Sequence, residues 1–266
     1  MVLKYSHITV ITFSSPIHAH SFSMRCSPYQ SICQHIIEEH VSAIPNCNIS
    51  RNTDFMGNTV DYGYIDDYHD SFAFESRGLV SVDRHIYPGD FNPLFLYESP
   101  LTSPSAALMY LAHQLGSTTG EEALIRKISD LIHEHIQYVS GSTDVCTSAE
   151  VAFAQGKGVC QDFAHIAICL CRLCGVAARY VNGYMLGEGQ THAWVEYYVA
   201  DLKEWHAFDP TNNKAVDDTY IKLAHGRDYN DCCTNHGVFR GSGDQTIHVS
   251  MSVREVLRGN IINSTI

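Results

Sequence analysis

The chain has 266 residues, of which 45% are hydrophobic and 17% charged, as is typical of a globular protein with one large or two moderate domains. Its formal charge of -12 at pH 7 argues against nucleic acid or an anionic membrane as a partner, because both bind clusters of Lys and Arg. No stretch of the sequence approaches the roughly 18 consecutive apolar residues that a membrane-spanning helix needs.

Cysteine usage indicates a reducing compartment. Ten cysteines in a chain of this length are too few for a disulfide-stabilised scaffold, and the adjacent Cys232 and Cys233 are poorly placed to pair with each other. We therefore expect reduced thiols and a cytoplasmic location. Polar residues interrupt the N-terminal run ITVITF and its flanks, so a signal peptide is not expected. A reduced thiol stays free to act as a nucleophile.

Short segments rich in Thr, Val, Ile, Tyr and Phe, separated by turn signals, occupy the chain from residue 5 to about residue 81. They are YSHITVITF, AHSFSMRC, NTVDYGYI and DSFAFES. A further segment, SICQHIIEEHVSAIP, fits both the helical and the strand period, and its β-rich neighbours favour a strand. Residues 1–90 are therefore predicted to form a small β-sandwich-type domain.

A proline-rich segment, PGDFNPLFLYESPLTSP, is predicted to lead into a second domain of residues 91–266. Helical patterns follow in PSAALMYLAHQLG, TTGEEALIRKISDLIHEHIQYV and TSAEVAFAQG, with capping-box spacings that place Thr119 before Glu122 and Thr147 before Glu150. Strand patterns return in VAARYVNGYM, THAWVEYYV, EWHAFD and DQTIHVSMSV. Helices followed by antiparallel strands predict the α+β class.

The sequence GKGVCQDFAHIAICLCRLCG holds four of the ten cysteines in a predicted glycine turn and helix. Cys160 falls where the helix begins, and there the unpaired N–H groups and the helix dipole favour the thiolate, which is the nucleophilic form. The cysteines at positions 169, 171 and 174 lie in later turns and are interpreted as core or inert thiols. Asp162, in the first turn, opposes a thiolate at Cys160 electrostatically.

The hairpin THAWVEYYVADLKEWHAFDPT supplies the imidazole and the orienting group that cysteine catalysis requires. With a two-residue loop His192 lies directly opposite Asp209, and with a four-residue loop the two are diagonal neighbours on the same face. An odd-length loop places them on opposite faces. Either even loop predicts an imidazole beside a carboxylate, which fixes the tautomer of the imidazole and stabilises its protonated form.

Each of the three residues has a simpler interpretation when it is considered alone. Cys160 fits a buried thiol, His192 a strand histidine with satisfied hydrogen bonds, and Asp209, which precedes a proline, the start of an Asx-type turn. Together, a cysteine at a helix start, a strand histidine and an acid on the facing strand predict a catalytic triad. In this hypothesis Cys160 attacks an amide carbonyl and His192 protonates the departing amine.

The blocks GVCQDFAHIAICLCRLCGVAARYVNGY, THAWVEYYV and WHAFDPTNN, in this order, resemble the transglutaminase-like superfamily, in particular its bacterial branch of candidate cysteine proteases. DFMGN with its flanking strands, and GRDYND, are also similar to that branch. The resemblance implies a papain-like core fold after a β-rich domain, with Cys160 as nucleophile, His192 as base and Asp209 as orienting acid. The segment CCTNHG at 232–237 departs from the branch, so no role is carried over to it.

The predicted function is thiol acyl transfer on amide bonds, most simply as a cysteine peptidase or amidase acting on a peptide or protein. A protein-glutamine transglutaminase or an amide synthase passes the acyl group to an amine and uses the same three residues. A non-catalytic interaction module on the same fold is the remaining alternative. The backbone N–H of Cys160 is one expected donor to the oxyanion.

Four side chains near the predicted triad are candidates for substrate binding: Gln155, Gln161, Tyr184 and Trp194. Each fits an ordinary role equally well, the glutamines as turn or surface residues and the aromatic residues as packed strand residues. The sequence has no cluster of Cys and His with zinc spacing and no acidic loop of the EF-hand type. We therefore expect neither a metal nor another cofactor.

Overall fold

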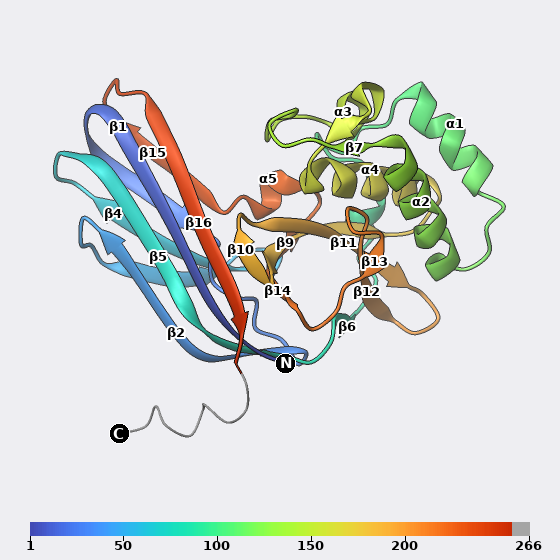
Figure 1. The fold of residues 1–266 in the computed structure, drawn as a ribbon, viewed down its shortest axis with the longest axis horizontal. Helices are drawn as coiled ribbons and strands as arrows, with labels where there is room; N and C mark the ends of the chain where they lie inside the picture. Colours follow the sequence, from blue (N-terminus) through green and yellow to red (C-terminus); the bar gives the residue numbers. More distant parts are fainter. Residues whose placement is uncertain (257–266) are drawn as a thin grey trace.

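The computed structural model describes residues 1–256, and the last ten residues of the predicted second domain, 257–266, lie outside the described residues. Figure 1 shows two parts: a β-rich part, built mainly from the N-terminal third of the chain, and an α+β part that carries the described helices. The α+β class and the preceding β-rich region agree with the prediction from sequence.

The β-rich part is a sandwich of two layers, and β1 (Val2–Met24) belongs to both of them. Its first half pairs with β5 (His69–Val82) and β16 (Gln245–Glu255), and its second half pairs with β4 (Thr59–Ile65) and β15 (Asn235–Arg240). β2 (Gln34–Ile44) lies beside β5, and β3 (Ile49–Thr53) lies beside β4. The ambiguous segment around residue 36 is thus a strand, as its neighbours suggested.

Both ends of the described chain contribute to this sandwich. The division at residue 90 assigns β15 and β16 to the second domain, whereas in the structure both strands pair with β1. Met251 and Val253 of β16 are buried in one cluster with Leu3 and Tyr5 of β1, so apolar burial holds the returning strand in place. The sequence carries no local signal for this pairing, because the two strands lie more than 200 residues apart.

The α+β part contains an antiparallel sheet of six described strands in the order β13-β12-β11-β9-β14, with β6 beside β12. Their bounds are β6 (Ile86–Pro88), β9 (Ala178–Met185), β11 (His192–Val199), β12 (Glu204–Asp209), β13 (Lys214–Ala215) and β14 (Tyr220–Gly226). The short β10 (Gly187–Gly189) leaves this sheet and pairs with β16 of the sandwich. β7 (Gln137–Tyr138) and β8 (Lys157–Gly158) form a separate parallel pair.

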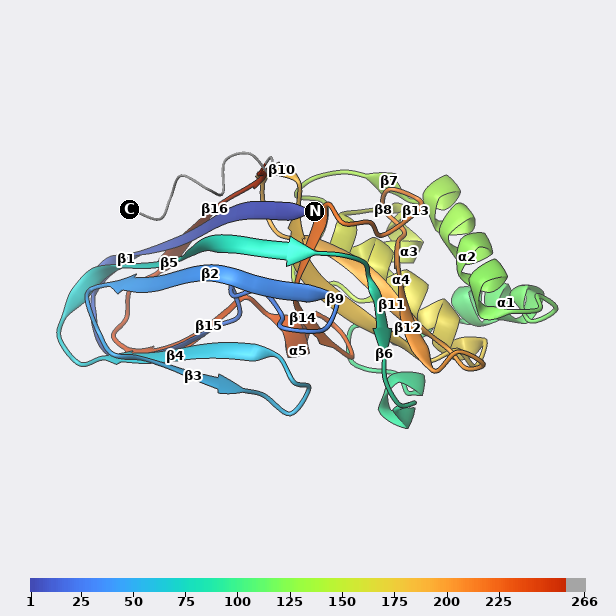
Figure 2. The same cartoon turned by 90° about the horizontal axis from the view of Figure 1, so that it is seen from below.

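α4 (Cys160–Leu173) is the central helix of this part (Figures 1 and 2). The helices α1 (Ala106–Leu115), α2 (Glu121–His135) and α3 (Ala149–Gln155) pack around it, and β9 and β11 lie against its other side. Every side chain from Gln161 to Arg172 is buried, including the polar side chains of Asp162, His165 and Arg172. The short helices η1 (Pro93–Leu96) and α5 (Tyr229–Cys232) complete the described helices.

Two helix starts differ from the predicted capping boxes. The N-cap of α2 is Gly120, whose φ of 85° is accessible to glycine, and no side chain caps this helix. Ser148 caps α3 by accepting a hydrogen bond from the backbone N–H of Val151, while the hydroxyl of Thr147 bonds to the Asp144 carboxylate. In both cases the helix begins one residue later than the spacing of Thr and Glu predicts.

The sheet of the α+β part has one face toward α4 and one face away from it. Side chains on the first face join the core around α4 and include Tyr180, Val195, Tyr197 and Phe208. Because strand residues alternate, His192, Trp194 and Glu196 of β11 share the opposite face. That face therefore carries polar groups along its length, and the candidate site lies at one end of it.

Candidate active site

Cys160 is the first residue of α4 and is half-buried. The residue before it, Val159, is extended, and its N–H donates to the Asp162 carboxylate over 2.7 Å. The hydroxyl of Thr143 donates to the same oxygen over 2.6 Å. Gly158 leaves room for this turn, because a Cβ there would lie 2.7 Å from the Cβ of Asp162. The turn thus holds the thiol at the start of the helix.

The later cysteines of α4 lie in a different environment. Cys169 and Cys171 are buried in the core, and Cys174 is half-buried at the end of the helix. Burial raises the pKa of Cys169 to about 12 and raises that of Cys171 further. These thiols therefore stay protonated at neutral pH, as the interpretation of core cysteines requires.

The hairpin of β11 and β12 has the four-residue loop. Val195 pairs with Phe208 and Val199 with Glu204, so residues 200–203 form the loop. This register makes His192 and Asp209 diagonal neighbours on one face, which is one of the two even arrangements expected from the sequence. Their side chains meet, and His192 Nε2 lies 2.7 Å from Asp209 Oδ2.

The imidazole of His192 lies between the Asp209 carboxylate and the Cys160 thiol. Only 12% of its side chain is exposed. Burial disfavours the charged ring, but the hydrogen bond with Asp209 and the nearby Cys160 outweigh it and raise the pKa of His192 to about 10. Since Nε2 is engaged by the carboxylate, Nδ1 remains for the thiol. The structure therefore brings the three predicted side chains together in the order thiol, imidazole, acid.

Asp209 is fully buried and is surrounded by hydrogen-bond donors. The backbone N–H groups of Thr211 and Asn212 donate to Oδ1, and the Asn212 side chain and the Tyr220 hydroxyl donate to Oδ2 over 2.7 and 2.8 Å. Burial alone would raise the pKa of this carboxyl, but His192 and these donors lower it below the usual value. The acid is thus held ionised and in one orientation.

Trp194 supports the imidazole from the side. Its indole lies nearly parallel to the His192 ring, with centroids 6.4 Å apart and planes 28° apart. Gly183 of the neighbouring strand β9 leaves space for the indole, because a Cβ at that position would lie 2.4 Å from the Trp194 ring. A larger residue there would displace the indole and with it the support of His192.

The thiol and the imidazole line a cavity of about 340 Å³ between the two parts of the molecule. Tyr180, Asn182, Thr191 and Tyr229 of the α+β part contribute to its wall. The opposite wall includes Ile247 and Val249 of β16, which belongs to the sandwich. The β-rich part therefore shapes the candidate active site, which the division into two sequence segments did not predict.

The four candidate substrate-binding residues have different positions. Gln161 lines the cavity, although its amide donates to the carbonyl of Val145 over 3.1 Å. Gln155 is exposed at the end of α3 and does not line the cavity. Tyr184 and Trp194 are fully buried and also lie outside the cavity wall. Tyr180 and Asn182 also line the cavity and were not predicted from the sequence, although strand alternation in β9 places the two side chains on one face.

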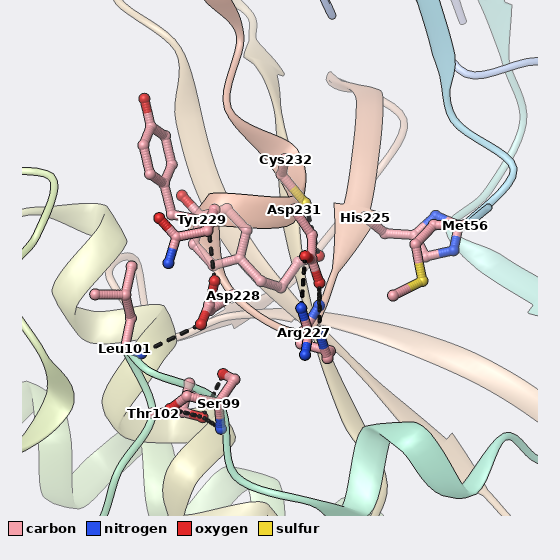
Figure 3. Close-up of polar contacts among 12 residues, drawn as sticks. Met56, Ser99, Leu101, Thr102, His225, Arg227, Asp228, Tyr229, Asp231 and Cys232 are labelled. Carbon is pink, nitrogen blue, oxygen red and sulfur yellow. Dashed lines mark hydrogen bonds and ion pairs between the residues drawn. The ribbon is translucent and has the colours of Figure 1, made fainter. Parts of the chain in front are cut away.

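The segment GRDYND positions Tyr229 at the cavity (Figure 3). Asp228 caps α5 by accepting from the N–H of Asn230, and it also accepts from the N–H of Leu101. Arg227 donates through its Nε and Nη2 to the Asp231 carboxylate over 2.9 and 3.0 Å. These bonds fold six residues into a rigid turn that carries the tyrosine.

Comparison with known proteins agrees with this geometry. Residues 110–210 match the family model of the transglutaminase-like superfamily, and residues 3–81 match that of the bacterial transglutaminase-like N-terminal region. The chain is 25% identical over 275 residues to an uncharacterized protein of Mycobacterium leprae, covering 94% of this chain and 98% of that protein. It is 26% identical over 287 residues to an uncharacterized protein of Mycobacterium tuberculosis, covering 94% and 91%.

The fold is also similar to the crystal structure of a candidate cysteine protease from Cytophaga hutchinsonii. The TM-score is 0.79 at 24% identity, and the match covers 96% of this chain and 92% of that chain. Residues 110–210 thus carry the core of the transglutaminase-like superfamily, and residues 3–81 carry the N-terminal region found in its bacterial members. None of the helices within residues 1–256 is both long and apolar enough to cross a membrane.

Proposed function

We propose that this protein is a thiol acyl-transfer enzyme that cleaves amide bonds, as a cysteine peptidase or amidase, with Cys160, His192 and Asp209 as its catalytic triad. The observation that carries the proposal is the position of His192, which is hydrogen-bonded to a buried carboxylate and lies beside a thiol at a helix start. This arrangement opens onto a cavity, so a substrate carbonyl has access to the thiol.

The chemistry follows from these positions. His192, whose pKa is raised to about 10, holds the proton that Cys160 gives up, and the Cys160 thiolate attacks the amide carbonyl carbon. The imidazolium then donates its proton to the departing amine, which leaves a thioester on the enzyme. In the second half-reaction His192 removes a proton from water, the resulting hydroxide displaces the thiolate, and a carboxylic acid is released. Asp209 holds the imidazole in one orientation and stabilises its charged form throughout.

The start of α4 also provides for the oxyanion. The backbone N–H of Cys160 lies in the first helical turn, where N–H groups have no acceptor within the helix. We assign it as one donor to the negative charge that develops on the carbonyl oxygen. The side-chain amide of Gln161 is a less suitable second donor, since it already donates to the Val145 carbonyl.

The cavity suits a peptide segment. Its wall combines amide and hydroxyl side chains, among them Asn182, Gln190, Thr191 and Asn235, with the apolar side chains of Ile247 and Val249. Such a wall binds both the backbone amides and the side chains of an extended peptide. The description of the Cytophaga hutchinsonii structure as a candidate cysteine protease agrees with this substrate class.

We also place the protein in a reducing, cytoplasmic environment. All ten cysteines are free thiols, and an enzyme with a thiol nucleophile requires that Cys160 stay reduced.

The test is to incubate the protein with a peptide library, with and without a labelled primary amine, and to read the products by mass. Cleavage products without label are expected for a peptidase or amidase, and they should disappear in Cys160→Ala. The exposed Cys146→Ala is the matched control and should retain activity. Label incorporation would favour transfer to an amine instead of hydrolysis. Products that persist in Cys160→Ala, or their absence under all conditions, would overturn the proposal.

A further inference from the structure

A second cavity, of about 470 Å³, lies where loops of the sandwich meet the sheet of the α+β part. Its wall combines polar side chains, among them Gln30, Asn92 and Arg179, with five aromatic ones: Tyr29, Phe55, Tyr87, Phe95 and Trp205. It shares no lining residue with the cavity at Cys160, and the proposed mechanism does not use it. Its volume lies in the range of roughly 300–1,000 Å³ that is usual for small-molecule sites.

A buried cluster of charged side chains lies beneath this cavity. Glu196 is fully buried and accepts from Arg179 Nε over 2.6 Å and from Lys222 Nζ over 2.7 Å. Two cations thus share one anion. Burial, the largest influence, lowers the pKa of Lys222 to about 7 in spite of Glu196. The acidic side chain that lines the cavity, Asp90, is exposed at its rim. Arg179 therefore carries the fixed positive charge of this cluster.

Arg179 connects this cluster to the cavity. Its side chain lines the cavity and lies over the Trp205 ring, with the guanidinium carbon 4.3 Å from the ring centroid. Its Nε donates to Glu196. Its two terminal amino groups have no acceptor within residues 1–256, and they are not among the buried atoms, so they remain accessible. A guanidinium in this position presents two N–H donors to the cavity, which is the geometry that a carboxylate accepts.

His225 is the second polar group at this wall. It is 5% exposed, and its buried Nδ1 has no hydrogen-bond partner among the described residues. His225 and Met56 both line this cavity, and Figure 3 labels the two side chains. Burial and the nearby Arg179 and Lys222 lower its pKa well below the ordinary value, so the ring is neutral. A neutral imidazole offers a polar contact to a ligand without adding charge.

We propose that this cavity is a second ligand site, which binds a small carboxylate with a flat apolar body. The carboxylate pairs with the guanidinium of Arg179, and the apolar body lies among the aromatic walls. A free phosphate fits less well, because it has no apolar part to cover those walls and carries a larger hydration cost. The site does not include Cys160, so its binding of a ligand can be tested independently of the proposed enzyme activity.

The first experiment compares three probes on the full chain by isothermal titration calorimetry and thermal unfolding. Benzoate is expected to bind and to raise the melting temperature. Benzamide has the same shape without the charge and should bind at least tenfold more weakly, and inorganic phosphate should bind more weakly than benzoate. Binding of benzamide as tight as that of benzoate, or no binding of benzoate at 10 mM, roughly the weakest affinity worth calling a site, would overturn the proposal.

The second experiment uses variants. Arg179→Gln should weaken benzoate binding by roughly ten- to one-hundredfold, because a charged hydrogen-bond pair is lost. Since this change touches a buried cluster, Phe55→Ala provides an independent variant: Phe55 is 78% exposed, so its loss should leave the fold intact and still weaken binding. Cys160→Ala should bind benzoate like the wild type. Unchanged binding in Phe55→Ala, or loss of binding in Cys160→Ala, would contradict the site.

Discussion

One face of the central sheet carries two groups of buried polar side chains, and the two groups are built differently. At the start of β11, His192 lies near the Cys160 thiol and is hydrogen-bonded to one acid, Asp209. Four residues further along the strand, Glu196 is held between Arg179 and Lys222. The first group is suited to move a proton, because its imidazole is hydrogen-bonded to a carboxylate and lines the same cavity as the thiol. In the second group the hydrogen bonds from Arg179 and Lys222 hold Glu196 in place, so this group serves stability.

The largest expected effect concerns the acid of the first group. Asp209→Asn keeps the shape of the side chain but removes the charge that supports the imidazolium. We expect kcat/KM for amide cleavage to fall by about 10³- to 10⁴-fold. Steady-state kinetics with a cleaved peptide measures it. A fall of less than about tenfold would show that Asp209 does not act through His192.

The acid of the second group should affect stability instead. Glu196→Gln leaves two buried cations without their anion, and we expect the free energy of unfolding to fall by about 3–5 kcal/mol. Urea denaturation measures it. Glu204→Gln is the matched control, because Glu204 pairs with His206 at the surface over 3.0 Å. That change should cost less than about 1 kcal/mol. An equal loss of unfolding free energy in the two variants would contradict the stabilising role assigned to the buried Glu196.

The pH dependence of stability separates the two groups further. The pKa of His192 is raised from 6.5 to about 10 in the folded protein, so protonated His192 stabilises the fold fully below pH 6.5. This contribution is lost as the pH rises toward 10, and each pKa unit of difference corresponds to about 1.4 kcal/mol. The stability difference between wild type and His192→Gln should therefore shrink between pH 6.5 and 10. A constant difference would contradict the raised pKa.

The smallest effect is expected for a donor to the acid. Tyr220→Phe removes one of the hydrogen bonds to Asp209, worth about 1 kcal/mol, so kcat/KM should fall by roughly five- to tenfold. Tyr64→Phe removes a similar bond to Asp66 at the surface and serves as the control. Activity should be unchanged in that variant, and equal losses in both would argue against an ordering role for Tyr220.

Local patterns were sufficient to predict the elements that build the candidate site. The glycine turn predicted the helix start at Cys160, and the alternation in the hairpin predicted that His192 and Asp209 lie on one face. Both predictions were possible because helix starts and strand parity depend on neighbouring residues only. The loop length remained open between two and four residues, and the structure has four. The exact helix caps at Gly120 and Ser148 were missed by one residue, since several polar residues competed for each cap.

Long-range contacts could not be predicted in this way. β16 pairs with β1 from the other end of the chain and supplies Ile247 and Val249 to the cavity wall, and no periodicity in the sequence indicates that partner. Tyr184 shows the same limit. As a strand aromatic it suited a substrate groove, but it is fully buried where the two parts meet and donates to the Cys26 carbonyl. Packing between distant segments decided its place.

The proposed function requires an activated thiol at Cys160, and the rate of alkylation of this thiol shows whether it is activated. Iodoacetamide at pH 6 reacts slowly with ordinary thiols, since they are protonated there. Mass analysis of the labelled peptides gives the rate for Cys160 and for Cys146, which is exposed and serves as an internal reference. We predict that Cys160, although half-buried, reacts at least tenfold faster. An equal or slower rate at Cys160 would contradict the proposed mechanism.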